Sequence, residues 1–334
     1  MSVLASSGIV TASTFSDSAS KLGNVIGVVA VFFAVILIIF FAAGRATGRL
    51  QRPLAILVFL GPAIVLLLVG LVIPAIRTFY LSLHGADLVG AKYVGMKNYT
   101  WAFTNPTEQQ VLLNTLLWLV IAPIVSTALG LLIAVGVDRM KRQNLVKSLI
   151  FMPMAISFVG AGIIWKYVYD KPPDGLLTAI VSALGWKNPP LWLLSHPLNN
   201  FLLMVIMIWI QTGFAMVVLS AAIKAIPDDV IEAARVDGAH GSRLFFSVQI
   251  PMIRSTLIVV LTTVMIATLK IFDIIKAVTG GNFGTNVLAN DMWNQTFVQF
   301  NVGRGSALAV IIFVAVAPLL AYNIVQLRKE RATR

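Results

Sequence analysis

Seven stretches of this sequence are apolar and almost free of charged residues over about twenty positions or more. They cover residues 22–44, 53–76, 109–137, 148–168, 197–223, 255–274 and 305–327. A helix of about twenty apolar residues is long enough to cross the roughly 30 Å hydrocarbon core of a bilayer. The predicted fold class is therefore all-α, a polytopic membrane protein with about seven transmembrane helices. Every gap between the stretches is too short for an inserted globular domain.

The composition agrees with this prediction and excludes several classes of site. Hydrophobic residues make up 58% of the chain and charged residues 11%, and the mean hydropathy is +0.90, values typical of polytopic membrane proteins. Cysteine is absent, so disulfides and thiolate metal sites are impossible, and three scattered histidines make a metal centre unexpected. No segment fits G-x-x-x-x-G-K-[ST], so we expect this chain to bind no ATP itself.

The distribution of basic residues predicts the orientation in the membrane. Residues 44–52, 138–147, 224–254 and 328–334 hold 15 of the 25 Lys and Arg residues in 57 positions. Cytoplasmic loops carry such an excess, which also explains the net charge of +12 without nucleic acid as a partner. We therefore expect the loop 224–254 and the C-terminus in the cytoplasm and the N-terminus outside.

The two ends of the chain are predicted to differ from its centre. Residues 1–21 are rich in Ser, Ala and Thr and are expected to form a disordered external tail. Residues 22–44 are interpreted as an additional N-terminal transmembrane helix, because a signal peptide would have a shorter apolar part and a more basic start. Residues 53–327 would form one transmembrane domain, followed by a basic cytoplasmic tail, 328–334.

The most polar part of the chain lies between two apolar stretches and reads EAARVDGAHGSRLFFSVQIP over residues 232–251. The pattern predicts helix, turn, helix. Pro227 and Asp228 suit a first helical turn, and Gly238 interrupts the helix at little conformational cost. Ser242 is expected to cap a second short helix, which Pro251 would end.

The residue order of this loop resembles the EAA loop of ABC importer permeases. Nine positions match it, namely Glu232, Ala233, Ala234, Asp237, Gly238, Ala239, Phe245, Ile250 and Pro251. Residues 209–227, 272–281 and 300–310 are similar to sugar permeases of the maltose type, and TGGNFGTNV resembles α-glucoside-type permeases. The likeness covers about residues 55–330 and implies a six-helix permease core, with the first helix outside it. A generic amphipathic hairpin between two membrane helices is the alternative.

The resemblance implies a transport subunit without catalytic residues, located in the plasma (inner) membrane of a prokaryote. It would form the pathway of a carbohydrate importer with a second, homologous permease and work by alternating access. Two ATPase subunits would bind ATP and Mg, and an extracytoplasmic solute-binding protein would deliver the sugar. Coupling to the ATPase would involve Glu232, Ala233, Ala234, Asp237, Gly238 and Ala239. A carboxylate such as Glu232 can form a charge-assisted contact with a basic partner, or it can simply be a solvated surface group.

A second set of residues is a candidate for the substrate pathway. Met207, Ile210, Gln211 and Phe214 follow the i, i+3, i+4, i+7 spacing of one helix face. Gln211 is the only amide within the span 201–223, and an amide facing lipid would be costly. In maltose-type permeases the corresponding face contacts sugar, and the same likeness adds Thr268 and Ile271. Gln211 could instead hydrogen-bond a neighbouring helix.

Two other classes of function fit the sequence less well. A secondary transporter should show ionisable residues or broken helices near the membrane midplane, whereas charge is nearly absent there. Lys270 and Asp273 are expected together near the outer end of one helix, where they can pair with each other. A membrane enzyme would need clustered carboxylates or a metal motif, and the acidic cluster 228–237 belongs to the loop already interpreted.

Overall fold

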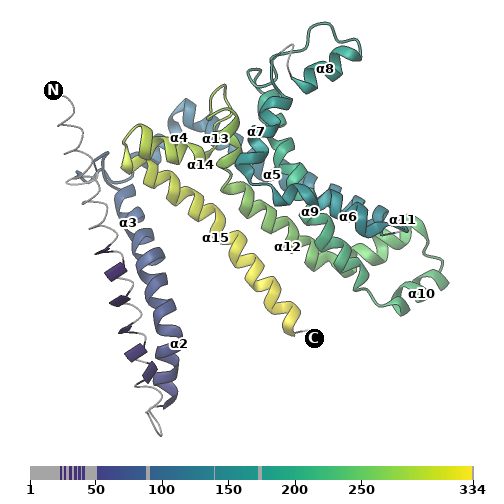
Figure 1. Ribbon diagram of the computed structural model, residues 1–334, viewed down its shortest axis with the longest axis horizontal. Helices are drawn as coiled ribbons and strands as arrows, with labels where there is room; N and C mark the ends of the chain where they lie inside the picture. Colours follow the sequence, from purple (N-terminus) through teal and green to yellow (C-terminus); the bar gives the residue numbers. More distant parts are fainter. Residues whose placement is uncertain are drawn as a thin grey trace, which may run out of the picture. The chain divides into compact units, whose positions relative to one another are not determined.

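The protein is a set of helices in the computed structural model drawn in Figure 1. The model describes residues 51–87, 91–138, 140–171 and 175–332, with short pieces between residues 23 and 41. Within these ranges the regular elements are helical, apart from one isolated bridge between His84 and Tyr93. The predicted all-α class is thus confirmed. The predicted tail 1–21 and much of the predicted helix 22–44 lie outside the described residues.

Five helices among the described residues are long and apolar enough to cross a membrane. They are Phe59–Ser82, Pro106–Val137, Leu198–Lys224, Gly241–Leu269 and Val302–Val325. A bent pair of helices within residues 143–168 brings the number to six if the pair is one span. These spans coincide with the six apolar stretches predicted from residue 53 onward, so the central part of the topology follows the sequence pattern closely.

Contacts along the chain divide it into two units, Met1–Arg77 and Thr78–Arg334. The first contains α2 (Gln51–Leu67), the π-helical turn η2 (Leu68–Val72) and the start of α3 (Ile73–Ser82). These three elements follow one another without a break, and their large apolar side chains are mostly exposed. Such a surface requires lipid or another protein chain to cover it.

The centre of the second unit is the packing of α5 (Pro106–Val137) along α9 (Leu198–Lys224). A Cβ atom on Gly130 would lie 2.5 Å from Cβ of Ala215, so the two helices approach as closely as they do only because residue 130 is glycine. The surrounding core consists of large buried side chains. They include Trp118, Leu203, Met204, Ile206, Met207, Ile274 and Ile275.

The span predicted over residues 148–168 is not one straight helix. It is divided into α6 (Gln143–Phe151), the 3₁₀ turn η3 (Met152–Ala155) and α7 (Phe158–Val168), with a bend of 99° between the two halves. Pro153 lacks the N–H that a continuous helix would need. Ser157 is extended, and its Oγ accepts a hydrogen bond from the N–H of Gly160 (3.1 Å), which starts a new helix.

The end of the second unit near the start of α5 is closed by short helices. They are α4 (Lys97–Thr104), α13 (Asp273–Val278), α14 (Leu288–Trp293) and the π-helical turn η5 (Asn294–Val298). The short helix α8 (Leu176–Ala183) contacts α7 and projects away from them (Figure 1). The long helix α15 (Val302–Ala332) follows them and includes much of the predicted basic tail. Earlier in the chain, α12 (Ile250–Leu269) ends before Lys270, and Asp273 is the first residue of α13. The prediction that Lys270 and Asp273 share one helix is therefore wrong.

A chain of buried amide side chains joins this closed end to α5 and α9. Nε1 of Trp118 donates to Oδ1 of Asn200 (2.7 Å), and Nδ2 of Asn200 donates to Oδ1 of Asn114 (3.0 Å). Nδ2 of Asn114 then donates to the backbone oxygens of Gly284 (2.7 Å) and Asn286 (2.9 Å). The stretch TGGNFGTNV is thereby attached to the transmembrane bundle. Satisfied buried networks of this kind fix one arrangement of a core.

Candidate functional site

The polar loop contains a short helix that ends in a defined turn. This helix, α10 (Asp228–Val236), follows Pro227 as predicted. The N–H of Ala239 donates to the oxygen of Ala234 (2.9 Å), and the N–H of Gly238 donates to that of Arg235 (3.0 Å). This pair of bonds is the Schellman motif, which needs a left-handed residue after the helix. Gly238 supplies it with φ of +84°, so the predicted role of this glycine is confirmed.

The predicted coupling residues lie together on and just beyond α10, and most of them face solvent. Glu232, Ala233, Asp237 and Gly238 are exposed, Ala234 is half-buried, and Ala239 is buried. Within the described part of the chain, no ion pair involves any of the carboxylates on α10.

The same surface also carries an apolar residue that the sequence interpretation missed. Val236 is 87% exposed at the end of α10. Single exposed apolar side chains are common on protein surfaces, and this one lies beside carboxylates that form no ion pair within the described part of the chain.

The second half of the loop is longer and more continuous than predicted. Beyond His240, α11 (Gly241–Leu244), the π-helical turn η4 (Phe245–Gln249) and α12 form one helix from Gly241 to Leu269. Pro251 does not end this helix, which corrects the prediction. Proline removes one N–H and crowds the preceding turn, and the wide turn immediately before it relieves that crowding.

Two adjacent phenylalanines in this wide turn differ in exposure. Phe245 is half-buried, whereas Phe246 is exposed. Phe245 is thus placed to anchor the helix to the rest of the chain, while Phe246 lies on its outer surface.

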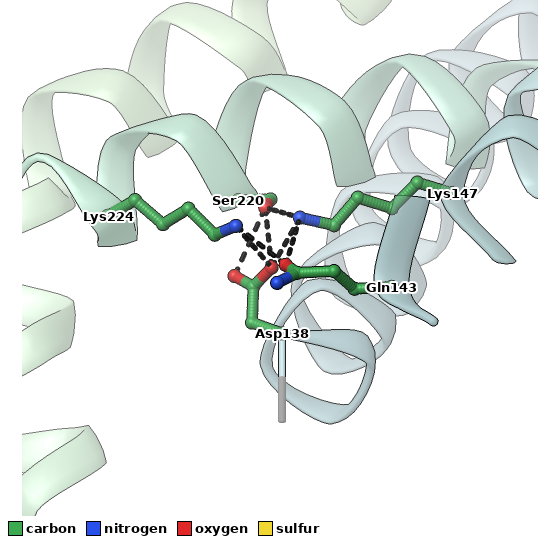
Figure 2. Close-up of polar contacts among 5 residues, drawn as sticks. All are labelled: Asp138, Gln143, Lys147, Ser220 and Lys224. Carbon is green, nitrogen blue, oxygen red and sulfur yellow. Dashed lines mark hydrogen bonds and ion pairs between the residues drawn. The ribbon is translucent and has the colours of Figure 1, made fainter. Parts of the chain in front are cut away.

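A cluster of five polar side chains lies where α5, α6 and α9 meet (Figure 2). Asp138 is at its centre and pairs with Nζ of Lys147. Oγ of Ser220 donates to both oxygens of Asp138, at 2.9 and 3.1 Å. Nζ of Lys224 donates to Oε1 of Gln143 (2.6 Å) and lies 3.6 Å from Asp138. We call these five residues the Asp138 cluster.

The position of the Asp138 cluster connects it to α10. Lys224 is the last residue of α9, and Pro227 precedes α10 directly. Between them, Ile226 is buried. The start of the α10 loop is thus fixed to the ends of two other transmembrane elements by charged hydrogen bonds, which are among the stronger ones in proteins. A displacement of α10 can therefore reach α5 and α6 through this cluster.

The sequence interpretation did not find the Asp138 cluster. Asp138 and Ser220 are 82 positions apart, and no motif joins them. The available signal was that Asp138 and Lys224 each directly follow a long apolar stretch, and that Lys147 directly precedes one. Charged residues in such positions are candidates for pairing.

The predicted pathway residues are inside the second unit rather than on a single open face. Met207, Ile210 and Ile271 belong to its main hydrophobic core. Phe214 is half-buried against a second core that includes Met216 and Val260.

The two polar members of the predicted pathway differ in their bonding. Oγ1 of Thr268 is bonded within its own helix, to the oxygen of Val264 (2.8 Å). Gln211 is buried, and none of the side-chain hydrogen bonds found among the described residues uses its amide. The amide atoms of Gln211 are not among the fully buried atoms that lack a partner, so they retain access to water or to a partner from outside this chain.

The described residues offer no evident place for a metal ion. No group of three or more His, Cys, Asp or Glu side chains comes together within that part of the chain. The residues described above provide contact surfaces and buried hydrogen bonds.

Comparisons with known proteins agree on one family. The sequence profile of the family described as "Binding-protein-dependent transport system inner membrane component" matches residues 126–334. The osmoprotective compounds uptake permease protein GgtC of Synechocystis sp. is 48% identical over 281 residues, which cover 83% of this chain and all of that protein. The alpha-glucoside transport system permease protein AglF of Rhizobium meliloti is 45% identical over 297 residues, 87% of this chain and 88% of that protein.

A solved structure shows the same fold at low sequence identity. It is a chain of the bacterial alginate ABC transporter, in a crystal structure with an alginate pentasaccharide-bound periplasmic protein. The TM-score is 0.71 at 20% identity, over 82% of this chain and 93% of that one.

Proposed function

The chain belongs to the family of binding-protein-dependent transport system inner membrane components, and from this membership we propose how it couples ATP hydrolysis to solute import. It is a permease subunit of an ABC importer and not an enzyme. In the proposed complex it pairs with a second, homologous permease. Two separate subunits bind ATP and Mg, and an extracytoplasmic solute-binding protein delivers the substrate.

The observation that best supports the coupling proposal is the structure of α10. It is a short helix with a rigid Schellman turn, an exposed carboxylate face and an exposed Val236. A docking helix needs these properties, because an apolar contact supplies affinity and unpaired charges supply orientation. In this proposal Glu232 and Asp237 face basic residues of the ATPase. Ala233, Ala234 and Ala239 allow close approach because their side chains are small.

Movement of the docked ATPase then passes into the membrane through the Asp138 cluster. The cluster joins the last turn of α9 to Asp138 after α5 and to Lys147 on α6. Since closely packed helices have discrete rather than continuous arrangements, a shift of α10 would switch all three helices together. That is the motion required for alternating access.

The proposed substrate is a small, uncharged glycoside of the α-glucoside class. The identity to an alpha-glucoside permease and the unpartnered amide of Gln211 support this proposal. Gln211, Met207, Ile210 and Phe214 would line the route on α9, with Thr268 and Ile271 behind them. In the structure most of these side chains are packed in the cores. The route would therefore open only when the helices move apart.

The proposed orientation places α10 and the C-terminus in the cytoplasm and the N-terminus outside. The concentration of 15 basic residues in 57 positions supports it. The end of the second unit that carries α14 would then face the solute-binding protein.

The experiment that tests the function uses the complete transporter in liposomes. ATP hydrolysis and solute uptake are measured with the loaded binding protein and a panel of α-glucosides, β-glucosides and charged glycosides. We expect ATP-dependent uptake of α-glucosides and no uptake without ATP. Uptake by this chain alone without ATP would refute the importer proposal. Uptake restricted to charged or β-linked solutes would refute the substrate class only.

A further inference from the structure

A second polar site lies at the other end of α5 from the Asp138 cluster. Glu108 is in the first turn of α5 and is 4% exposed, and Asp291 on α14 is 6% exposed. α14 packs against α5, and the two carboxyl groups are close enough to interact directly. Oε2 of Glu108 and Oδ2 of Asp291 are buried and have no donor from the described residues. The proposed coupling function uses neither residue.

Two buried carboxyl groups in contact cannot both be ionised at low cost. Two negative charges at this distance repel, and burial removes the water that would screen them. A single proton removes the repulsion, because the protonated group donates a hydrogen bond to the ionised one. Carboxyl pairs of this kind titrate as a unit.

The surrounding side chains stabilise one negative charge on the pair. Asp291 accepts hydrogen bonds from Nδ2 of Asn286 (2.9 Å) and from the side chain of Gln295. Glu108 faces the charged Arg304 of α15, whose guanidinium lies over the ring of Trp101 at 4.3 Å. The amide donors favour an ionised Asp291, whereas Arg304 favours an ionised Glu108, so the proton belongs to the pair rather than to one residue. Together with Arg304, a pair holding one proton has no net charge.

We propose that Glu108 and Asp291 form a proton-binding site whose shared proton holds α14 against the first turn of α5. The site also controls the TGGNFGTNV stretch, since Asn286 bonds Asp291 through its side chain and Asn114 through its backbone oxygen. The N–H of Leu288 in turn donates to Oγ1 of Thr115 on α5 (3.0 Å). Loss of the proton would therefore loosen the whole closed end of the unit. The proposal does not depend on which solute is carried.

The sign of the pH dependence follows from the burial of Asp291. Burial raises the pKa of this carboxyl above its ordinary value, and the Glu108 carboxyl is its direct neighbour. In the interval between the unfolded and the folded pKa, the native state binds more protons than the unfolded state. The free energy of unfolding therefore falls as the pH rises through that interval. The closed end should be most stable in mildly acidic solution.

The test measures the proton itself and its effect on the complete transporter complex. Infrared difference spectra taken during a pH titration show a protonated carboxyl by its carboxylic-acid C=O stretch. Thermal unfolding of the same complex is followed over the same range of pH. The variants are Glu108→Gln and Asp291→Asn, which keep size and can still donate across the pair. The control is Asp170→Asn, because Asp170 caps the N–H of Lys171 away from the pair.

In the wild type and in Asp170→Asn we expect one carboxylic-acid band, which disappears as the pH is raised. The temperature of thermal unfolding should fall over the same range of pH. Both pair variants should lack the band and lose the alkaline decrease in stability. An unchanged band in Glu108→Gln and Asp291→Asn would overturn the proposal. It would equally be overturned if no band were seen and stability depended on added Na⁺ or Ca²⁺ at fixed pH, because a metal ion would then occupy the site.

Discussion

Replacement of Gly238 by alanine disturbs the backbone shape of the α10 turn and leaves the other residues of the loop unchanged. Gly238 has φ of +84°, and an added Cβ would meet nothing within 4 Å. The substitution thus introduces no clash within this chain. Its cost is the left-handed backbone alone, about 1–2 kcal/mol for a residue with a side chain. This corresponds to a roughly 5- to 30-fold loss in the population of the docking geometry.

The assay is the affinity of the ATPase subunits for the permease pair, together with solute transported per ATP hydrolysed. Gly238→Asn should be less affected than Gly238→Ala, because asparagine tolerates the left-handed region better. Gly136→Ala is the matched control. Gly136 is a helical glycine in α5 with nothing within 4 Å of an added Cβ and without a positive φ, so alanine should stabilise its helix by about 1 kcal/mol. Wild-type affinity and coupling in Gly238→Ala would refute the reasoning.

Three further predictions follow from other parts of the chain. Asp138→Asn should weaken the attachment of the α10 loop by about 1–3 kcal/mol and lower the amount of solute transported per ATP. The control Lys141→Gln, in the same loop as Asp138, should change neither quantity. Equal effects of the two substitutions would contradict the role of the Asp138 cluster. Gln211→Ala should leave assembly intact and weaken solute transport by about 1–3 kcal/mol if a substrate hydrogen bond is lost, which uptake kinetics would show. His240→Cys, in a chain without native cysteine, should react with an impermeant thiol reagent in inverted vesicles and not in intact cells.

The sequence predicted those parts of the fold that depend on a single residue or on the composition of a single segment. The length of the uncharged stretches identified the six described spans, since crossing a bilayer demands little else. Gly238 was assigned correctly because only glycine takes the left-handed turn after a helix cheaply. The fit of α10 to a docking role likewise rests on local features, including its carboxylates and its small residues.

The parts that sequence did not predict depend on contacts between distant residues or on competition between neighbours. Pro153 breaks the span in which it lies, whereas Pro251 is accommodated by a π-helical turn and its helix continues. Proline alone does not distinguish these outcomes, because the neighbouring turn decides which one occurs. The Asp138 cluster and the Glu108–Asp291 pair join residues that are far apart in the chain. A single position can mark a charged residue as a candidate for pairing, but it does not identify the partner.

The most direct test of the central claim is site-specific crosslinking from α10 to the ATPase. Single cysteines replace Val236 and Leu184, two strongly exposed apolar residues (87% and 82%) that lie on different elements, α10 and the end of α8. A short thiol-to-amine crosslinker is then added to the assembled transporter, with and without ATP. The account predicts that position 236 crosslinks to the ATPase with a yield that changes with ATP, and that position 184 does not crosslink to it. Crosslinking of the ATPase to position 184 but not to position 236 would contradict it.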